Sequence, residues 1–198
     1  MTALLSAAEE LVSAGVSLIQ YRNKSGNARV MLEQARELRK RIESRVSQKT
    51  RDMGHPGVML IMNDRADLAL AADFDGVHVG QDDLSPESVR RIIGPDRWLG
   101  VSTHNPEQLR EADLTSADYL AIGPVFSTSS KEKPDPVVGL EGVRRARLLT
   151  RKPLVAIGGI TRENAAAVIE AGADCVAVIS DLIRSPRKSA EEFFRILR

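Results

Sequence analysis

The sequence predicts an α/β fold in which a parallel sheet closes into a barrel surrounded by helices, and three observations support this. Short apolar runs alternate with helical stretches along the 198 residues, as in proteins built from βα units. The apolar runs show little polar alternation, which is typical of strands covered on both faces. Polar residues follow nearly every run, and barrels carry their functional groups at these strand ends. An open doubly wound sheet competes, but the Gly-x-Gly-x-x-Gly turn of its dinucleotide sites is absent.

Seven strands are predicted where a closed (β/α)8 TIM barrel needs eight. They span Ser17–Tyr21, Val58–Met62, Gly76–Val79, Trp98–Val101, Tyr119–Ile122, Leu154–Ile157 and Val176–Ile179. The chain starts directly in a predicted helix, Leu4–Ser13, so the missing strand is the first one. Either the true start lies upstream of Met1, or the barrel is incomplete. The length suits a single domain over residues 1–198.

The remaining helices are predicted from periodicity and capping residues. They are Ala28–Val46, two helices opened by Ser85-Pro86 and Asn105-Pro106, Thr161–Glu170 and Ser189–Leu197. The polar segment Ser47–Gly57 is interpreted as a surface loop on the face opposite the active site.

Composition excludes several classes of function. Lys and Arg total 28 against 27 Asp and Glu, so the net charge of +1 gives no footprint for nucleic acid or an anionic membrane. The single cysteine, Cys175, allows no intrachain disulfide, fits a reducing compartment, and is expected to be a buried thiol. With no signal peptide and no membrane-length apolar stretch, we expect a cytoplasmic enzyme. Whether it forms a homo-oligomer is left open.

Cationic side chains follow the first predicted strand. Gln20, Arg22 and Lys24 alternate along the chain, so they project to the same side. A guanidinium beside an ammonium group is suited to phosphate or pyrophosphate. This signal is weak by itself, because charges on a surface loop would look the same.

Carboxylates follow the next two strands. Asp64 comes directly after the second strand, and Asp82 and Asp83 come after the third. Beside a pyrophosphate site they indicate Mg²⁺, which binds through one or two carboxylates together with substrate phosphates. Helix capping is the competing interpretation of each aspartate.

Two later strand ends offer groups that bind phosphate. The loop Ser127–Gly139 is the longest strand-to-helix loop, with a run of hydroxyl residues followed by Lys131, and such loops often act as lids or binding loops. After the last two strands, Gly158 and Gly159 allow close backbone approach and Ser180 adds a hydroxyl. Barrel enzymes often bind a phosphate at this place.

The ordered set of these motifs resembles the thiamine-phosphate synthase family. The matching motifs are Gln-x-Arg-x-Lys, Asn-Asp-Arg, Gly-Val-His-Val-Gly-Gln-Asp-Asp, Gly-Val-Ser-x-His, Gly-Pro-Val-Phe-x-Thr-x-Ser-Lys, Gly-Gly-Ile and Val-Ile-Ser, from about Leu11 to the end. The resemblance implies a Mg²⁺-dependent transferase of thiamine biosynthesis. Such an enzyme couples hydroxymethylpyrimidine diphosphate with thiazole phosphate, giving thiamine phosphate and pyrophosphate.

The resemblance also implies residue roles. Arg22, Lys24, Ser102 and Lys131 would act as catalytic residues on the diphosphate, helped by Gln20, with Asn63 contacting the pyrimidine. Asp64 and Asp83 would bind Mg²⁺. Thr128 and Ser130 would meet the thiazole phosphate, with Gly159, Ile179 and Ser180 around it, and Ser129 would also bind substrate.

Two other functions remain as alternatives. A thiazole tautomerase on the same barrel would need no diphosphate chemistry, but that family carries His where this sequence has Pro124 and lacks the carboxylate pair, Asp64 and Asp83. A non-catalytic phosphate-binding barrel is the second, and the retained polar set argues against it.

Overall fold

The computed structural model describes residues 2–24, 26–53, 57–128 and 135–197. Seven parallel strands form one sheet in the order β1-β2-β3-β4-β5-β6-β7. The strands are β1 Leu18–Tyr21, β2 Met59–Asn63, β3 Gly76–Val79, β4 Trp98–Thr103, β5 Tyr119–Ile122, β6 Leu154–Ile157 and β7 Cys175–Ala177. The helices are α1 Thr2–Ala14, α2 Ala28–Met53, α3 Ala66–Ala71, α4 Pro86–Ile93, α5 Pro106–Asp113, α6 Gly139–Leu149, α7 Ala165–Glu170, α8 Ser180–Ile183 and α9 Pro186–Ile196.

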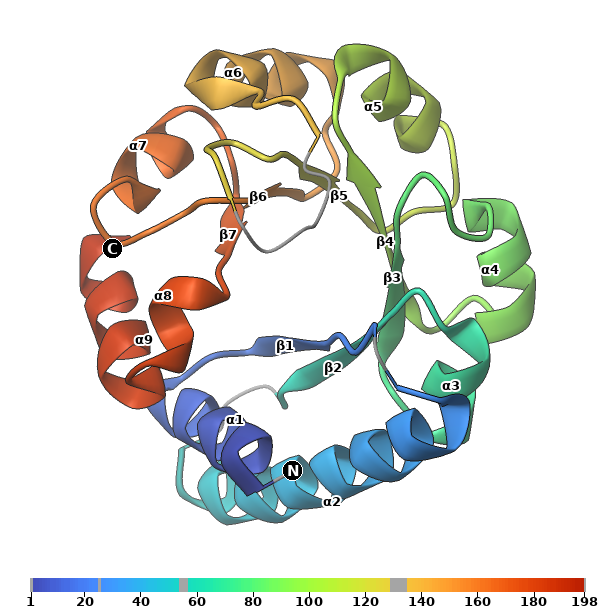
Figure 1. Cartoon of the computed structure of the whole chain (residues 1–198), viewed down its shortest axis with the longest axis vertical. Coiled ribbons are helices and arrows are strands. Elements are labelled where there is room, and N and C mark those ends of the chain that lie inside the picture. Colours follow the sequence, from blue (N-terminus) through green and yellow to red (C-terminus); the bar gives the residue numbers. More distant parts are fainter. Residues whose placement is uncertain (1, 25, 54–56, 129–134, 198) are drawn as a thin grey trace.

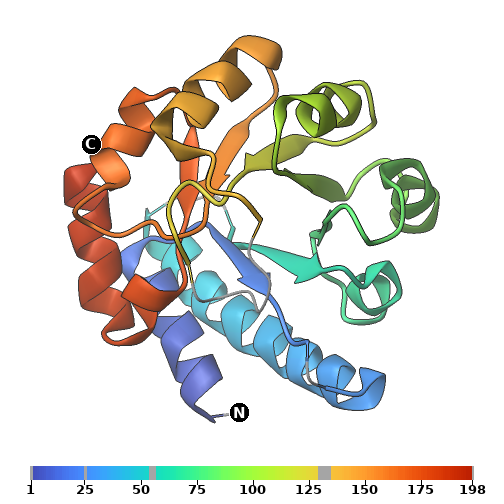
Figure 2. The same ribbon diagram turned by 45° about the horizontal axis from the view of Figure 1, so that its top comes forward.

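The sheet curls into a TIM-barrel-like ring with the helices outside it (Figure 1). Among the described residues β1 pairs only with β2 and β7 only with β6, so the ring is open between β1 and β7. The prediction of a barrel with seven strands is therefore confirmed for the described chain. The helix layer continues across this opening, because α1 packs against α9 and α2 (Figure 2).

The core lies mainly between the strands and the helices that cover them. Leu38 and Ile42 of α2 are buried there, as are Val89 and Ile93 of α4. Ser85 caps α4 as predicted, since its hydroxyl accepts the N–H of Ser88. No helix among the described residues is long and apolar enough to cross a membrane.

Three aspartates brace the amino ends of the strands in the same way. Each aspartate is the residue directly before a strand. Its carboxylate accepts, at 2.7 Å, the backbone N–H of a leucine in the neighbouring strand that comes earlier in the sequence. The same carboxylate pairs with an arginine from a helix. The sets are Asp75 with Leu60 and Arg39, Asp118 with Leu99 and Arg90, and Asp174 with Leu154 and Arg147. These braces fix β2 to β3, β4 to β5 and β6 to β7.

Two expectations from the sequence are wrong. The segment Ser47–Gly57 is not all loop, because α2 continues to Met53. The polar composition of this segment favoured a loop, although its backbone is helical as far as Met53. Cys175 is exposed rather than buried, because β7 is an edge strand with a neighbour on one side only.

Candidate functional site

The carboxyl ends of the seven strands meet at one rim of the ring, because every neighbouring pair is parallel. Most of the predicted site residues lie on or just beyond these ends. The described ones are Gln20, Arg22 and Lys24 at β1, Asn63 and Asp64 at β2, Asp83 after β3, Ser102 in β4, Thr128 after β5, Gly159 after β6, and Ile179 and Ser180 after β7. Ser129, Ser130 and Lys131 lie outside the described residues, so the structure does not place them.

Charged groups from three strand ends converge at one point of this rim. The ammonium group of Lys24 lies 3.6 Å from a carboxylate oxygen of Asp64. The Asp64 carboxyl in turn contacts that of Asp83. Arg22 is exposed and has no carboxylate partner among the described residues. The structure therefore brings Lys24 together with the two carboxylates that the sequence predicted separately.

The two carboxylates are held by the local backbone. Asp64 adopts a left-handed conformation, with φ of 63°, and its N–H donates to the carbonyl of His78 on the next strand. Asp83 accepts the N–H of Gly80 at 2.8 Å, which turns its side chain back toward the rim.

This pair fits a divalent cation. Burial raises the pKa of Asp64, the contact with Asp83 and its charge raise it further, and Lys24 opposes the rise. A bound cation would relieve this repulsion. Among the described residues no group of three or more metal-binding side chains occurs, and two carboxylates are what Mg²⁺ needs when phosphates and waters complete its shell.

Ser102 lies beside this cluster on β4 and is fixed from two sides. Its hydroxyl is 2.7 Å from Nε2 of His78, and its carbonyl accepts the side-chain N–H of Gln81 at 2.6 Å. His78 is 8% exposed, and its Nδ1 lies 3.0 Å from the hydroxyl of Tyr119. Burial lowers the pKa of His78 to about 4, against the opposing charge of Asp83, so the ring is neutral near pH 7. His78 is therefore a packed, neutral histidine.

The glycines after β6 allow a close backbone approach. Gly158 and Gly159 both have positive φ, and a Cβ on Gly159 would lie 2.6 Å from the carbonyl oxygen of Ser127. The N–H of Phe126 donates to the carbonyl of Gly158. The β5 and β6 loops are thus packed backbone to backbone, which any larger residue would prevent.

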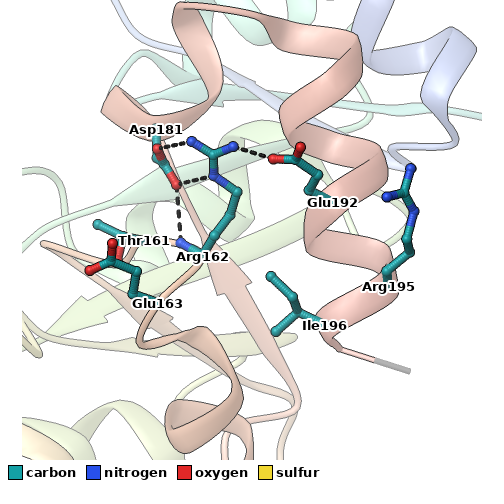
Figure 3. A pocket seen from close by; sticks show the side chains of 7 residues that line it. All are labelled: Thr161, Arg162, Glu163, Asp181, Glu192, Arg195 and Ile196. Atoms are coloured by element: carbon teal, nitrogen blue, oxygen red, sulfur yellow. Dashed lines mark hydrogen bonds and ion pairs between the residues drawn. The ribbon is translucent and has the colours of Figure 1, made fainter.

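An ion-pair network ties the β6 loop to the helices that follow β7. Arg162 donates three bonds to Asp181, one from its backbone N–H and two from its guanidinium, and it also pairs with Glu192 of α9 (Figure 3). The hydrogen bonds from Arg162 lower the pKa of Asp181, although burial opposes this. Ser180 lies directly before Asp181 and is exposed at the start of α8.

A hollow of about 520 Å³ lies beside this network (Figure 3). It is lined by Thr161, Arg162, Glu163, Asp181, Glu192, Arg195 and Ile196. Reasoning from the sequence missed this network. The only signal was that Arg162 lies two residues after the Gly-Gly-Ile motif and that Asp181 directly follows the Val-Ile-Ser motif.

The fold and the rim together define a class of protein, a parallel barrel with charged and polar side chains gathered at the carboxyl ends of its strands. The chain matches the family described as thiamine monophosphate synthase over residues 1–182. It is 58% identical over 197 residues to the thiamine-phosphate synthase of Koribacter versatilis (strain Ellin345), covering 100% of this chain and 88% of that protein. A second relative, from Chloroflexus aurantiacus, is 45% identical over 175 residues, covering 88% of this chain and 76% of that protein, and has the same name.

A solved structure agrees with this. The thiamine phosphate pyrophosphorylase from Pyrococcus furiosus superposes with a TM-score of 0.83 at 34% identity, covering 98% of this chain and 88% of that chain. The chain belongs to the thiamine monophosphate synthase family, a family of transferases in thiamine biosynthesis. The resemblance found in the sequence motifs is confirmed.

Proposed function

We propose that this protein couples hydroxymethylpyrimidine diphosphate with thiazole phosphate, releasing pyrophosphate and forming thiamine phosphate. The observation that carries the proposal is the convergence of Lys24, Asp64 and Asp83 from three adjacent strand ends. The reaction is inferred from membership of the family. The rim has the cationic and metal-binding side chains that would stabilise the negative charge of a departing diphosphate.

The difficult step is the departure of pyrophosphate from the pyrimidine methylene carbon. The C–O bond breaks, its electron pair leaves with the diphosphate, and the thiazole nitrogen supplies the pair for the new C–N bond. Arg22, Lys24 and the hydroxyl of Ser102 stabilise the growing negative charge, with Gln20 beside them. Fixed donors aimed at developing charge are usually the largest contribution to catalysis. Asn63 orients the pyrimidine ring.

Asp64 and Asp83 would hold Mg²⁺, which neutralises diphosphate charge when bound. The mutual repulsion of these carboxylates supports this role. Gly159, Ile179 and Ser180 are assigned to the thiazole phosphate, because they follow the last two strands at the rim and the hydroxyl of Ser180 is on an exposed residue. Thr128 and Ser130 are also assigned to the thiazole phosphate, Ser129 to substrate binding, and Lys131 to the diphosphate. The cytoplasmic location expected from the sequence remains part of the proposal.

The test is to mix both substrates with Mg²⁺ and measure thiamine phosphate and pyrophosphate together. Asp64→Asn and Asp83→Asn should each reduce turnover by on the order of 100-fold or more, since charge stabilisation is lost. Asp82→Asn is the matched control, because Asp82 is an exposed neighbour to which no role is assigned. Mg²⁺ should also raise the melting temperature of the wild type, as any ligand of the native state does, but not that of Asp83→Asn.

Full turnover in EDTA, or equal rates for Asp83→Asn and Asp82→Asn, would exclude the metal assignment. Isomerisation of a thiazole precursor without coupling would instead identify a tautomerase.

A further inference from the structure

A hydrogen-bonded chain of side chains runs beneath the rim, from Tyr119 through His78 to Ser102. The hydroxyl of Tyr119 lies 3.0 Å from Nδ1 of His78, and Nε2 of the same ring lies 2.7 Å from the hydroxyl of Ser102. Tyr119 is 6% exposed. Only the last member of the chain, Ser102, is less than fully buried. These hydrogen bonds therefore connect the buried hydroxyl of Tyr119 to Ser102 at the rim, where the diphosphate is assigned.

The register of the strands, with a glycine on the middle one, provides the space for these hydrogen-bonded side chains. His78, Gly100 and Tyr119 are in register on three adjacent strands, so all three face the inside of the ring. A Cβ on Gly100 would lie 2.1 Å from the ring of Tyr119 and 2.5 Å from Nδ1 of His78. Glycine on the middle strand is what allows the two outer side chains to meet. Ser102 lies two residues beyond Gly100 and faces the same way.

The direction of the protons follows from counting donors and acceptors. Tyr119 has one O–H, and Nδ1 of His78 is its only hydrogen-bond partner among the described residues. If Nδ1 carried the proton, the buried O–H of Tyr119 would have no acceptor, which is costly. Nδ1 is therefore the acceptor. The neutral ring then carries its proton on Nε2 and donates it to the oxygen of Ser102. Ser102 must direct its own proton elsewhere.

We propose that Tyr119 and His78 are positioning residues that fix the proton direction of Ser102, so that its hydroxyl points as a donor toward an anionic leaving group. This rests on the proposed function, in which Ser102 contacts the diphosphate. Neither Tyr119 nor His78 touches the substrate. They act by preventing Ser102 from donating inward, and a donor aligned in advance needs no reorientation during the reaction.

The first test measures the tautomer directly and does not depend on activity. Side-chain nitrogen resonances in ¹⁵N-histidine-labelled protein distinguish the two neutral tautomers. Wild-type His78 should be protonated at Nε2, and in Tyr119→Phe this tautomer should lose population. Tyr21→Phe is the matched control, because the hydroxyl of Tyr21 bonds Gln34 on the outer side of the sheet. It should leave the His78 signals unchanged. Wild-type His78 protonated at Nδ1 would overturn the proposal, even if Tyr119→Phe does not fold.

The second test is kinetic and uses a double-mutant cycle. Tyr119→Phe should lower kcat by about tenfold, a size typical of losing an outer supporting hydrogen bond, with little change in KM. Ser102→Ala should lower it more. In the Ser102→Ala background Tyr119→Phe should cost nothing further, because no hydroxyl remains to be directed. The same loss in both backgrounds would mean that Tyr119 is merely structural.

The two tests separate the inference from the proposed function. If the wild type makes no thiamine phosphate, the proposed function fails while the tautomer measurement still decides the proton direction. If the wild type is active but His78 is protonated at Nδ1, the inference fails and the proposed function stands.

Discussion

Removing one of the aspartate braces at the amino ends of the strands, that of Asp118, should lower the free energy of unfolding by a predictable amount. One carboxylate oxygen of this residue accepts the N–H of Leu99 at 2.7 Å and the guanidinium of Arg90 at 2.6 Å. Leu99 is fully buried, whereas the side chain of Asp118 is 40% exposed. Asp118→Ala removes both contacts without touching the opposite rim.

The expected loss can be worked out contact by contact. A hydrogen bond from a buried backbone N–H to a charged acceptor contributes about 1.5–3 kcal/mol. A half-exposed ion pair adds at most about 1 kcal/mol. Arg90 keeps its bonds to backbone carbonyls, including those of Arg97 and Ser116, so it is not left unpaired. We expect Asp118→Ala to lower the free energy of unfolding by about 2–3 kcal/mol, which for this chain length lowers the melting temperature by about 5–10 °C.

Urea unfolding followed by circular dichroism, together with the melting temperature, measures this loss. Asp118→Asn keeps an acceptor oxygen but loses the charge, so it should cost about half as much. Asp96→Ala is the control, because Asp96 is exposed on a loop beside the same strand and should change stability by less than about 0.5 kcal/mol. If Asp118→Ala matches Asp96→Ala, the braces do not hold the sheet and the reasoning is refuted.

Three further predictions follow from other contacts. Gly100→Ala should destabilise the protein by about 3 kcal/mol or more, because its Cβ would overlap Tyr119 and His78; Gly57→Ala, with nothing within 4 Å of its Cβ, should be nearly neutral in the same melts. Cys175 is an exposed residue, so thiol reagents should reach its sulfur in the native protein, and protection without denaturant would contradict its exposure. Partial desolvation of the sulfur still raises the pKa of the thiol, so the rate measured by mass spectrometry should keep rising above pH 8.5, the usual thiol pKa. Arg162→Ala should destabilise the protein at pH 7. The Asp181 pKa is depressed by Arg162, so this contribution is present above the ordinary carboxyl pKa and is lost as pH falls through the depressed one; a stability difference from wild type that stays constant down to pH 3 would argue against the pair.

Much of the fold could be predicted because parallel strands have a strong local signature. Runs such as Leu154–Ile157 are apolar on both faces, and the structure has this strand with the predicted bounds. Helix starts were equally local, since Ser85 and Asn105 cap as expected. The last strand was placed late, at Val176–Ile179 instead of Cys175–Ala177, because apolar residues continue past its end toward α8.

Candidate site residues could be chosen from the sequence, but the geometry that brings them together could not. Asp64 and Asp83 could be chosen because each follows a strand, but their contact depends on the left-handed turn at Asp64, which no local pattern signals. The partners of His78 could not be predicted either. Tyr119 begins its strand, and Gly100 is an ordinary strand glycine until the register aligns them. The contact of His78 with Tyr119 depends on the register between strands that are far apart in the sequence.

Aspartates have opposite effects on stability at the two ends of the strands, because their partners differ. At the amino ends Asp75, Asp118 and Asp174 each meet an arginine and a backbone N–H, so their charge is balanced within the protein. At the carboxyl ends Asp64 and Asp83 face each other, and a single lysine, Lys24, offsets their two negative charges. A balanced carboxylate stabilises the native state, whereas an unbalanced pair costs stability until a cation arrives. The unbalanced carboxylates thus lie at the rim to which we assign the substrates. Substitutions there should gain stability and lose activity, whereas those at the opposite end should only lose stability.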